Sequence, residues 1–297
     1  MKEKRLQAKE IFAAAGRILS PVLVYFFLSV GIELFYLALT GLLQRRYAES
    51  TAWRLFSENE SLVMMLLISF PALFVLYRMF RRDELLCVTD YQSRKRFPYI
   101  RYVVLAGLGA SVGFNILIQM SPLIEWFPSI LGVNEELSGS STALSLFYVA
   151  LVAPVTEELL LRGLVFRRCR EYLHFVPAAL LSALIFGALH ANMVQFIYAF
   201  LLGTVLAYLY EYYGTLLAPV LFHIAGNLLG NLSVLFIPTV PSPAGNALAL
   251  GAGLLFVLLM LWACVQVRKK VRPPVRRKLQ LFEDGENGPG GGVETKQ

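Results

Sequence analysis

The chain has 297 residues, of which 57% are hydrophobic and only 16% charged, and its mean hydropathy is +0.61. Soluble domains carry about 25% charged residues, so this composition excludes an ordinary soluble enzyme and indicates an integral membrane protein. The formal net charge is +7. Nucleic-acid binding is not expected, because the basic residues cluster between the apolar stretches, where they set membrane topology and contact lipid.

Eight long apolar stretches follow one another, each near the roughly 20 residues that a helix needs to cross a bilayer. They are 18–43, 61–80, 102–120, 143–166, 175–191, 194–213, 216–236 and 246–267. We therefore predict an all-α fold, a polytopic transmembrane helical bundle of about eight spans over residues 18–267, preceded by a cytoplasmic segment, 1–17. The first stretch is too long for the apolar part of a signal peptide, so it is predicted to be a retained span.

The Lys and Arg residues predict the orientation of the bundle. Seven lie from Arg78 to Arg101 and seven from Arg268 to Lys278, whereas none lies from Tyr102 to Leu161. The positive-inside rule then places both termini in the cytoplasm, as an even number of spans requires. Residues 268–297 are predicted to form a cytoplasmic tail that is basic at first; after Lys278 it is rich in Gly and charge, which predicts disorder there. The expected location is the plasma membrane of a bacterial cell.

One acidic residue, Glu33, lies in the middle of the first stretch. A carboxyl group in a membrane span usually faces the interior of the bundle and is hydrogen-bonded there. We therefore expect Glu33 to be tucked against another helix.

Two adjacent glutamates interrupt the fourth stretch, and each charge near a bilayer centre costs roughly 2.5–3.5 kcal/mol. Glu158 and Arg162 stand at i, i+4, which predicts an ion pair on one helix face. Glu157 then points elsewhere and has no partner within its own helix. Pro154 removes a backbone hydrogen bond, which predicts a kink with room for water. A carboxylate beside that water is a candidate general base.

Histidine is scarce, and two of the three histidines lie in apolar stretches. His190 follows Phe186 by one turn, and His223 precedes Asn227 by one turn. Together with Glu157 they make a set of one base, two imidazoles and one carboxamide on three helices. Routine packing does not account for all of them at once.

The segments EELLLR (157–162), FGALH (186–190) and HIAGN (223–227) resemble the EExxxR, FxxxH and HxxxN motifs of the CAAX protease and bacteriocin-processing (CPBP, or Abi) family of intramembrane proteases. That family includes the type II CAAX prenyl endopeptidases. The order of the motifs matches, and 33 residues separate Glu157 from His190 and His190 from His223. The resemblance covers about 143–236, the predicted protease region. Members often carry an aromatic residue where this chain has Leu161, which is a packing difference.

The resemblance implies an endopeptidase whose catalytic residues are Glu157, His190, His223 and Asn227, supported by Glu158, Arg162 and Phe186. In the favoured version, Glu157 assisted by His190 deprotonates a water, and His223 with Asn227 stabilises the oxyanion. In a second version, Glu157, His190 and His223 hold a divalent metal such as zinc with an open water position. No cofactor is required by the first version, and the H-E-x-x-H signature of zinc proteases is absent.

Two other classes of function stay open. A proton-coupled transporter would use Glu33, Glu157, His190 and His223 as a relay. A non-catalytic membrane immunity or scaffold protein would keep the motifs without turnover. The expected partners are a membrane-associated protein or peptide substrate and the lipid bilayer, with no nucleic acid.

The depth of His190 conflicts with this set when straight helices are assumed. Counting from Ala143 places Glu157 toward the cytoplasm, whereas His190 ends the fifth stretch near the outer side. Either the fifth span is strongly tilted and sunk, or the segment 167–175 already dips into the bilayer.

Overall fold

The computed structural model describes residues 8–85, 97–128, 142–190, 192–238 and 242–274. Within these ranges the regular structure is helical and no β-strand occurs, which confirms the all-α prediction. The predicted tail lies outside the described residues from 275 onward, as does the N-terminal segment up to residue 7.

The helices that precede the motif region are α1 (Ala8–Tyr47), α2 (Thr51–Ser57), α3 (Glu60–Leu85), α4 (Ile100–Gln119) and α5 (Leu123–Trp126). The fourth predicted span is one long helix built from α7 (Thr142–Phe147), η2 (Tyr148–Val152), α8 (Ala153–Glu158), η3 (Leu159–Phe166) and α9 (Arg167–Tyr172). After it come α10 (Phe175–Ala188), α11 (Met193–Tyr213), α12 (Leu217–Gly230), η4 (Asn231–Phe236) and α13 (Pro243–Lys270).

An apolar helix forms at each of the eight predicted positions, but their lengths differ. In the described part of the chain, six helices are long and apolar enough to cross a membrane: Ala8–Tyr47, Glu60–Leu85, Ile100–Gln119, Ala143–Tyr172, Met193–Tyr213 and Pro243–Lys270. The other two, α10 and α12, have 14 residues each. Such a helix is about 21 Å long, less than the roughly 30 Å hydrocarbon core of a bilayer.

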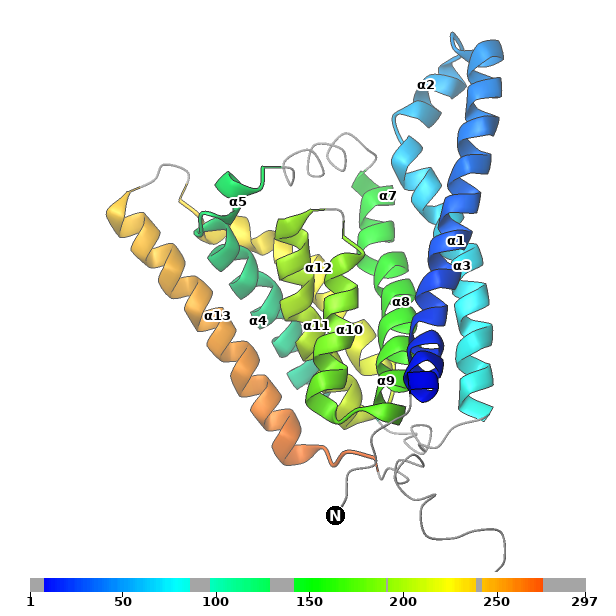
Figure 1. The fold of residues 1–297 in the computed structure, drawn as a ribbon. Helices are drawn as coiled ribbons and strands as arrows, with labels where there is room; N and C mark the ends of the chain where they lie inside the picture. Colours follow the sequence, from blue (N-terminus) through cyan, green and yellow to red (C-terminus); the bar gives the residue numbers. More distant parts are fainter. Residues whose placement is uncertain (1–7, 86–96, 129–141, 191, 239–241, 275–297) are drawn as a thin grey trace, which may run out of the picture.

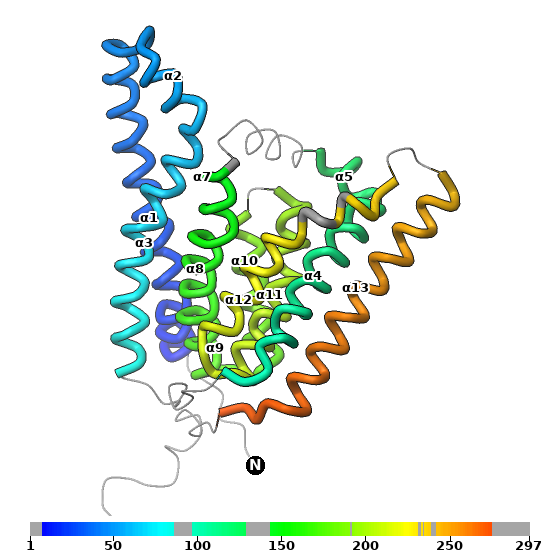
Figure 2. Tube along the Cα trace, turned by 180° about the vertical axis from the view of Figure 1, so that it is seen from behind, coloured from blue at the N-terminus to red at the C-terminus, as the bar shows by residue number. Residues whose placement is uncertain are grey.

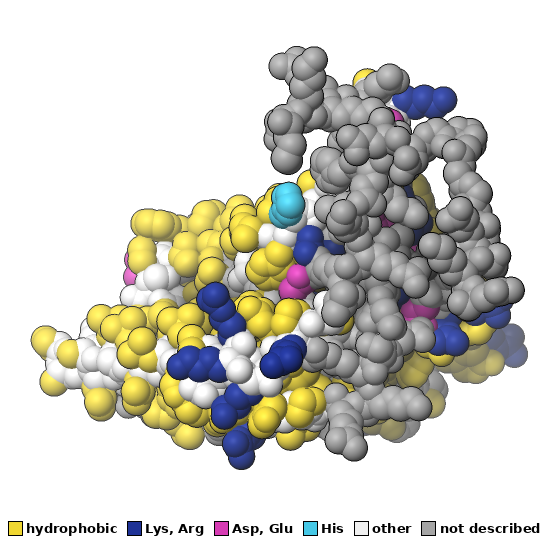
Figure 3. Space-filling model, turned by 90° about the horizontal axis from the view of Figure 1, so that it is seen from below, with side chains coloured by type: hydrophobic (Ala, Val, Ile, Leu, Met, Phe, Trp, Pro, Cys, Tyr) yellow, Lys and Arg dark blue, Asp and Glu magenta, His cyan; other side chains and the backbone are white. Residues whose placement is uncertain are grey.

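The helices stand side by side in a bundle (Figures 1 and 2). The α1–α2–α3 hairpin forms one side and α4 with α13 the other, and the helices that carry the motifs lie between them. α1 begins and α13 ends at the same end of the bundle (Figure 1), as an even number of crossings requires. That end is basic: the last turn of α13 carries Arg268, Lys269 and Lys270, and Figure 3 shows Lys and Arg side chains gathered there.

Glycines allow α13 to pack closely on α4. A Cβ atom on Gly109 would lie 2.6 Å from the carbonyl oxygen of Phe256, and one on Gly113 would lie 2.9 Å from the backbone nitrogen of Val257. Small residues at such positions let two membrane helices approach backbone to backbone. With α13 on one side and α12 on the other, α4 is largely buried.

The expectation for Glu33 is wrong. Its side chain is exposed on α1, and it has no hydrogen bond or ion pair with another described residue. The reason lies in how α1 packs, because it turns one narrow face toward the bundle through residues such as Ile18 and Tyr36. Glu33 lies beside that face.

Candidate active site

The position of His190 follows from a helical hairpin that is longer than predicted. The fourth helix does not end at Phe166 but continues through α9 to Tyr172, and α10 begins at Phe175. Glu157 precedes Leu173 by 16 residues (173 − 157), and His190 follows His174 by 16 residues (190 − 174). Because the two arms are antiparallel, equal counts from the turn bring both side chains to the same level. Residues 167–172 extend the hairpin, which removes the conflict in depth.

Two π-helical segments, η2 and η3, flank the glutamates on the fourth helix. The N–H of Ala153 donates to the carbonyl of Tyr148, five residues earlier, and Pro154 follows in the first turn of α8. A proline causes least disruption where a helical segment begins, because its missing N–H is not needed there. The predicted interruption at Pro154 is therefore a π-turn. Such turns are rare and occur frequently at functional sites.

The predicted ion pair forms, and it extends to a histidine. Arg162 Nη1 lies 3.0 Å from Glu158 Oε1, and both side chains are fully buried. The same oxygen lies 2.9 Å from His223 Nδ1, and His223 Nε2 lies 3.6 Å from Glu157 Oε2. His223 thus stands between the two glutamates. Because a carboxylate oxygen only accepts, the ring donates its Nδ1–H to Glu158.

Phe186 separates the buried arginine from the histidines. The Arg162 guanidinium lies 4.9 Å from the centre of the Phe186 ring, an arrangement in which cation and ring attract each other. The same ring meets His190 edge-on at 5.2 Å and His223 at 5.9 Å between ring centres. Phe186 therefore fixes the relative positions of both imidazoles by packing.

A glycine on α11, Gly203, provides a second hydrogen-bond acceptor for Arg162 and the space for its side chain. Arg162 Nη2 donates to the carbonyl oxygen of Gly203 at 3.0 Å. A Cβ atom on Gly203 would lie 2.9 Å from Ala183 Cβ and 3.2 Å from Arg162 Nη2, so only glycine leaves this space. The sequence reasoning missed Gly203, because an isolated glycine in an apolar stretch carries no signal of its own.

Glu157 and His190 line one cavity of about 270 Å³. The other lining residues are mostly apolar or aromatic: Tyr25, Met65, Ile68, Tyr148, Thr156, Leu160, Phe186 and Leu189. The side chain of Glu157 is 31% exposed, whereas that of Glu158 is fully buried. Tyr25 and Tyr148 were not predicted, because neither belongs to a motif: Tyr25 lies on α1, and Tyr148 lies in η2 on the same helix as Glu157.

The hydrogen bond of His190 defines which of its nitrogens faces away from the backbone. His190 Nδ1 lies 2.9 Å from the carbonyl oxygen of Phe186. A carbonyl accepts, so Nδ1 carries the proton, and the Nε2 atom of the neutral ring is an acceptor. His190 is therefore prepared to receive a proton.

Asn227 lies on α12 one turn after His223, as predicted, and its side chain contacts the fourth helix. Asn227 Nδ2 donates to the carbonyl oxygen of Val149 at 2.6 Å, which ties α12 to the π-segment η2. Asn227 does not line the cavity. Its role as an oxyanion donor stays a prediction.

The metal version of the site lacks a converging donor set. Across the residues that the structure describes, no group of three His, Cys, Asp or Glu side chains is arranged to hold a metal ion. The Nδ1 atoms of His190 and His223 are held by a backbone carbonyl and by Glu158, which leaves their Nε2 atoms as the only ring nitrogens that could bind a metal.

Comparison with known protein families gives one match. Residues 139–229 match the family model described as "Type II CAAX prenyl endopeptidase Rce1-like", in agreement with the resemblance seen in the motifs. The matched segment contains Glu157, His190, His223 and Asn227. Neither the curated proteins nor the solved structures that were searched gave a match.

Proposed function

Because residues 139–229 carry a domain of the type II CAAX prenyl endopeptidase Rce1-like family, we propose that this chain is an intramembrane endopeptidase. Its substrate is a membrane-associated protein or peptide, one peptide bond of which it hydrolyses. The proposal rests on one observation: Glu157 and His190 line the same cavity, and His223 stands between Glu157 and Glu158 beside it.

Glu157 activates the water. Its carboxylate takes one proton as the water oxygen bonds to the scissile carbonyl carbon, giving a tetrahedral oxyanion. His190 Nε2 accepts a hydrogen bond from the same water and orients it. When the tetrahedral species collapses, the C–N bond breaks and the proton held by Glu157 passes to the leaving amine. General acid–base catalysis of this kind contributes about 10²–10⁴ in rate.

His223 stabilises the oxyanion. Its Nδ1–H is held by Glu158, which is itself held by Arg162, so the ring cannot rotate away. In the form that carries a second proton on Nε2, the ring is a cation paired with Glu158, and its Nε2–H lies on the side of Glu157, where it donates to the oxyanion once Glu157 has taken the water proton. Removing one such donor typically lowers the rate by about 10²–10³.

The test compares membranes of cells expressing wild type with those expressing Glu157→Ala, His190→Ala or His223→Ala, by quantitative membrane proteomics. We expect at least one cleavage product to vanish in all three variants while the protein is present at a normal level. Glu33→Gln is the matched control, because it removes a carboxylate from an apolar helix at a residue that does not line the cavity, and it should leave cleavage unchanged. If no product depends on all three residues, the protease proposal fails.

The same variants separate the other two functions. Proton-coupled uptake that is measurable in wild type and lost in Glu157→Gln identifies a transporter, because Glu157 would belong to its proton relay. A cellular phenotype that survives Glu157→Ala with normal expression identifies a non-catalytic partner protein.

Chelation tests the metal version directly. The glutamate mechanism predicts that the purified protein keeps full cleavage activity after treatment with a strong zinc chelator. Loss of activity that returns on adding back zinc would replace this mechanism with the metal-dependent one.

A further inference from the structure

A second cavity lies on the outside of the bundle, away from the catalytic residues. It is an apolar groove of about 630 Å³ where α10, α11 and α13 meet. Its walls include Val176 and Leu180 of α10 and Leu261 and Val265 of α13, which are between 45% and 60% exposed. From Met260 to Arg268 on α13 the groove runs along eight residues, about 12 Å. We call it the α10–α13 groove.

The polar groups that line this groove differ in their hydrogen bonds. The Tyr208 hydroxyl donates to the carbonyl of Cys264 at 2.9 Å, and the Thr204 hydroxyl donates to the carbonyl of Leu201 at 2.7 Å. Arg268 is the one charged residue of the lining, and it has no hydrogen bond or ion pair with another described residue. The Arg268 guanidinium therefore stands beside the apolar groove, and none of its donors is used by another described residue.

We propose that the α10–α13 groove binds one anionic phospholipid. An acyl chain lies along the apolar walls, and the phosphate accepts hydrogen bonds from Arg268. Arginine offers planar, paired donors that match a phosphate. The groove reaches Arg268 in the last turn of α13, where Lys269 and Lys270 follow it. Basic side chains beside membrane helices select anionic headgroups over zwitterionic ones.

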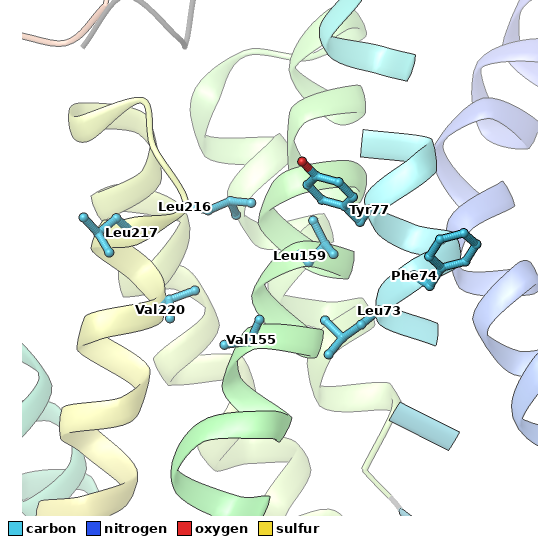
Figure 4. Close-up of a pocket in the computed structure, with 8 residues that line it drawn as sticks. All are labelled: Leu73, Phe74, Tyr77, Val155, Leu159, Leu216, Leu217 and Val220. Carbon is cyan, nitrogen blue, oxygen red and sulfur yellow. The ribbon is translucent and has the colours of Figure 1, made fainter. Parts of the chain in front are cut away.

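The chain provides an internal comparison for this argument. A second apolar groove, of about 540 Å³, lies between α3, the fourth helix and α12 (Figure 4). It is lined by residues such as Tyr77 and Leu217, and no charged residue is among them. We call it the α3–α12 groove. Its chemistry suits any acyl chain and gives no reason to prefer one headgroup.

Native mass spectrometry of the full chain in detergent tests the proposal with two probes, phosphatidylglycerol and phosphatidylcholine of identical acyl chains. We expect one phosphatidylglycerol to bind at a concentration about fivefold lower than the concentration at which phosphatidylcholine binds. This ratio corresponds to the contribution of one basic side chain to binding at an anionic membrane surface. Arg268→Gln removes this preference. Lys269→Gln makes the same change of charge one residue away, outside the groove, and keeps it.

Filling the grooves gives the second arm. Leu261→Trp occupies the α10–α13 groove and lowers the amount of bound phosphatidylglycerol, whereas Leu217→Trp in the α3–α12 groove leaves it unchanged. Both leucines are about half exposed, so neither change disturbs the core. The proposal is overturned if wild type binds the two lipids equally, if both charge variants lose the preference alike, or if Leu261→Trp has no effect.

Discussion

Glu157 and Glu158 are neighbours in sequence but have different environments. Glu157 faces a cavity and is partly exposed, whereas Glu158 is fully buried and receives Arg162 and His223 on a single oxygen. The other oxygen of Glu158 has no hydrogen-bond partner among the described residues. The i, i+4 spacing was sufficient to predict the pairing with Arg162. The contact with His223 was not predictable, because it depends on where α12 lies.

This difference predicts opposite effects for one chemical change made at two adjacent positions. Glu157→Gln removes the general base and lowers the cleavage rate by about 10²-fold or more, with little change in unfolding temperature. Glu158→Gln leaves Arg162 buried without its anion, and breaking a buried pair typically destabilises by about 3–5 kcal/mol. Thermal unfolding in detergent, measured beside cleavage, separates the two. Equal effects of both variants on unfolding would contradict the assignment.

Among the elements, the contact of α10 with α11 determines where Arg162 lies. Gly203→Ala places a methyl group against Ala183 and Arg162, and overpacking of this kind costs about 1–3 kcal/mol. We expect a lower unfolding temperature and reduced cleavage. Gly251→Ala is the control, because a Cβ there meets nothing within 4 Å and alanine is the better helix former. A normal unfolding temperature and activity for Gly203→Ala would show that α10 and α11 can move apart to accommodate the methyl group without cost.

A second prediction at this scale concerns the ion pairs that tie α1 and α3 to α9. Arg168 Nε lies 2.6 Å from Asp83 Oδ2, and both side chains are nearly buried. Asp83→Asn leaves Arg168 without its anion and should destabilise by about 3–5 kcal/mol. Glu84→Gln breaks a pair with Arg81 on the same helix; because the Arg81 side chain is about half exposed, its charge stays in contact with solvent, and the change should cost about 0–1 kcal/mol. Chemical unfolding of the two variants compares them, and similar losses would refute the difference.

The positions of the helices were predictable from apolar runs, because burial in lipid needs such runs whatever the tertiary packing. Their ends were not. The fourth helix continues past Phe166 through charged residues, since Arg168 and Arg170 are satisfied there by Asp83 and Glu211 on other helices. The π-turns were missed for a similar reason, as they depend on how η2 and η3 pack against their neighbours. The level of His190 depended on these features, so it needed the structure.

For the molecule as a whole, the two ends of the helical bundle differ in charge. α2 and the end of α13 lie at opposite ends of the bundle (Figure 1), and the second of these carries the denser basic charge. Arg268 of the α10–α13 groove lies at this basic end, so the proposed lipid binding depends on the orientation of the bundle in the membrane. Only one orientation brings Arg268 to the leaflet that presents anionic headgroups to the cytoplasm.

The positive-inside rule makes this orientation testable on intact cells. In a variant whose three native cysteines are replaced, we expect Ser57→Cys on α2 to react with a membrane-impermeant maleimide added outside. Lys269→Cys should react only after the cells are permeabilised, because the positive-inside rule predicts that this basic end faces the cytoplasm. Both positions are exposed, so burial does not explain a difference between them. The reverse labelling pattern would show that the topology is inverted and that Arg268 faces away from the anionic leaflet. Such a result would contradict the predicted orientation without affecting the protease mechanism.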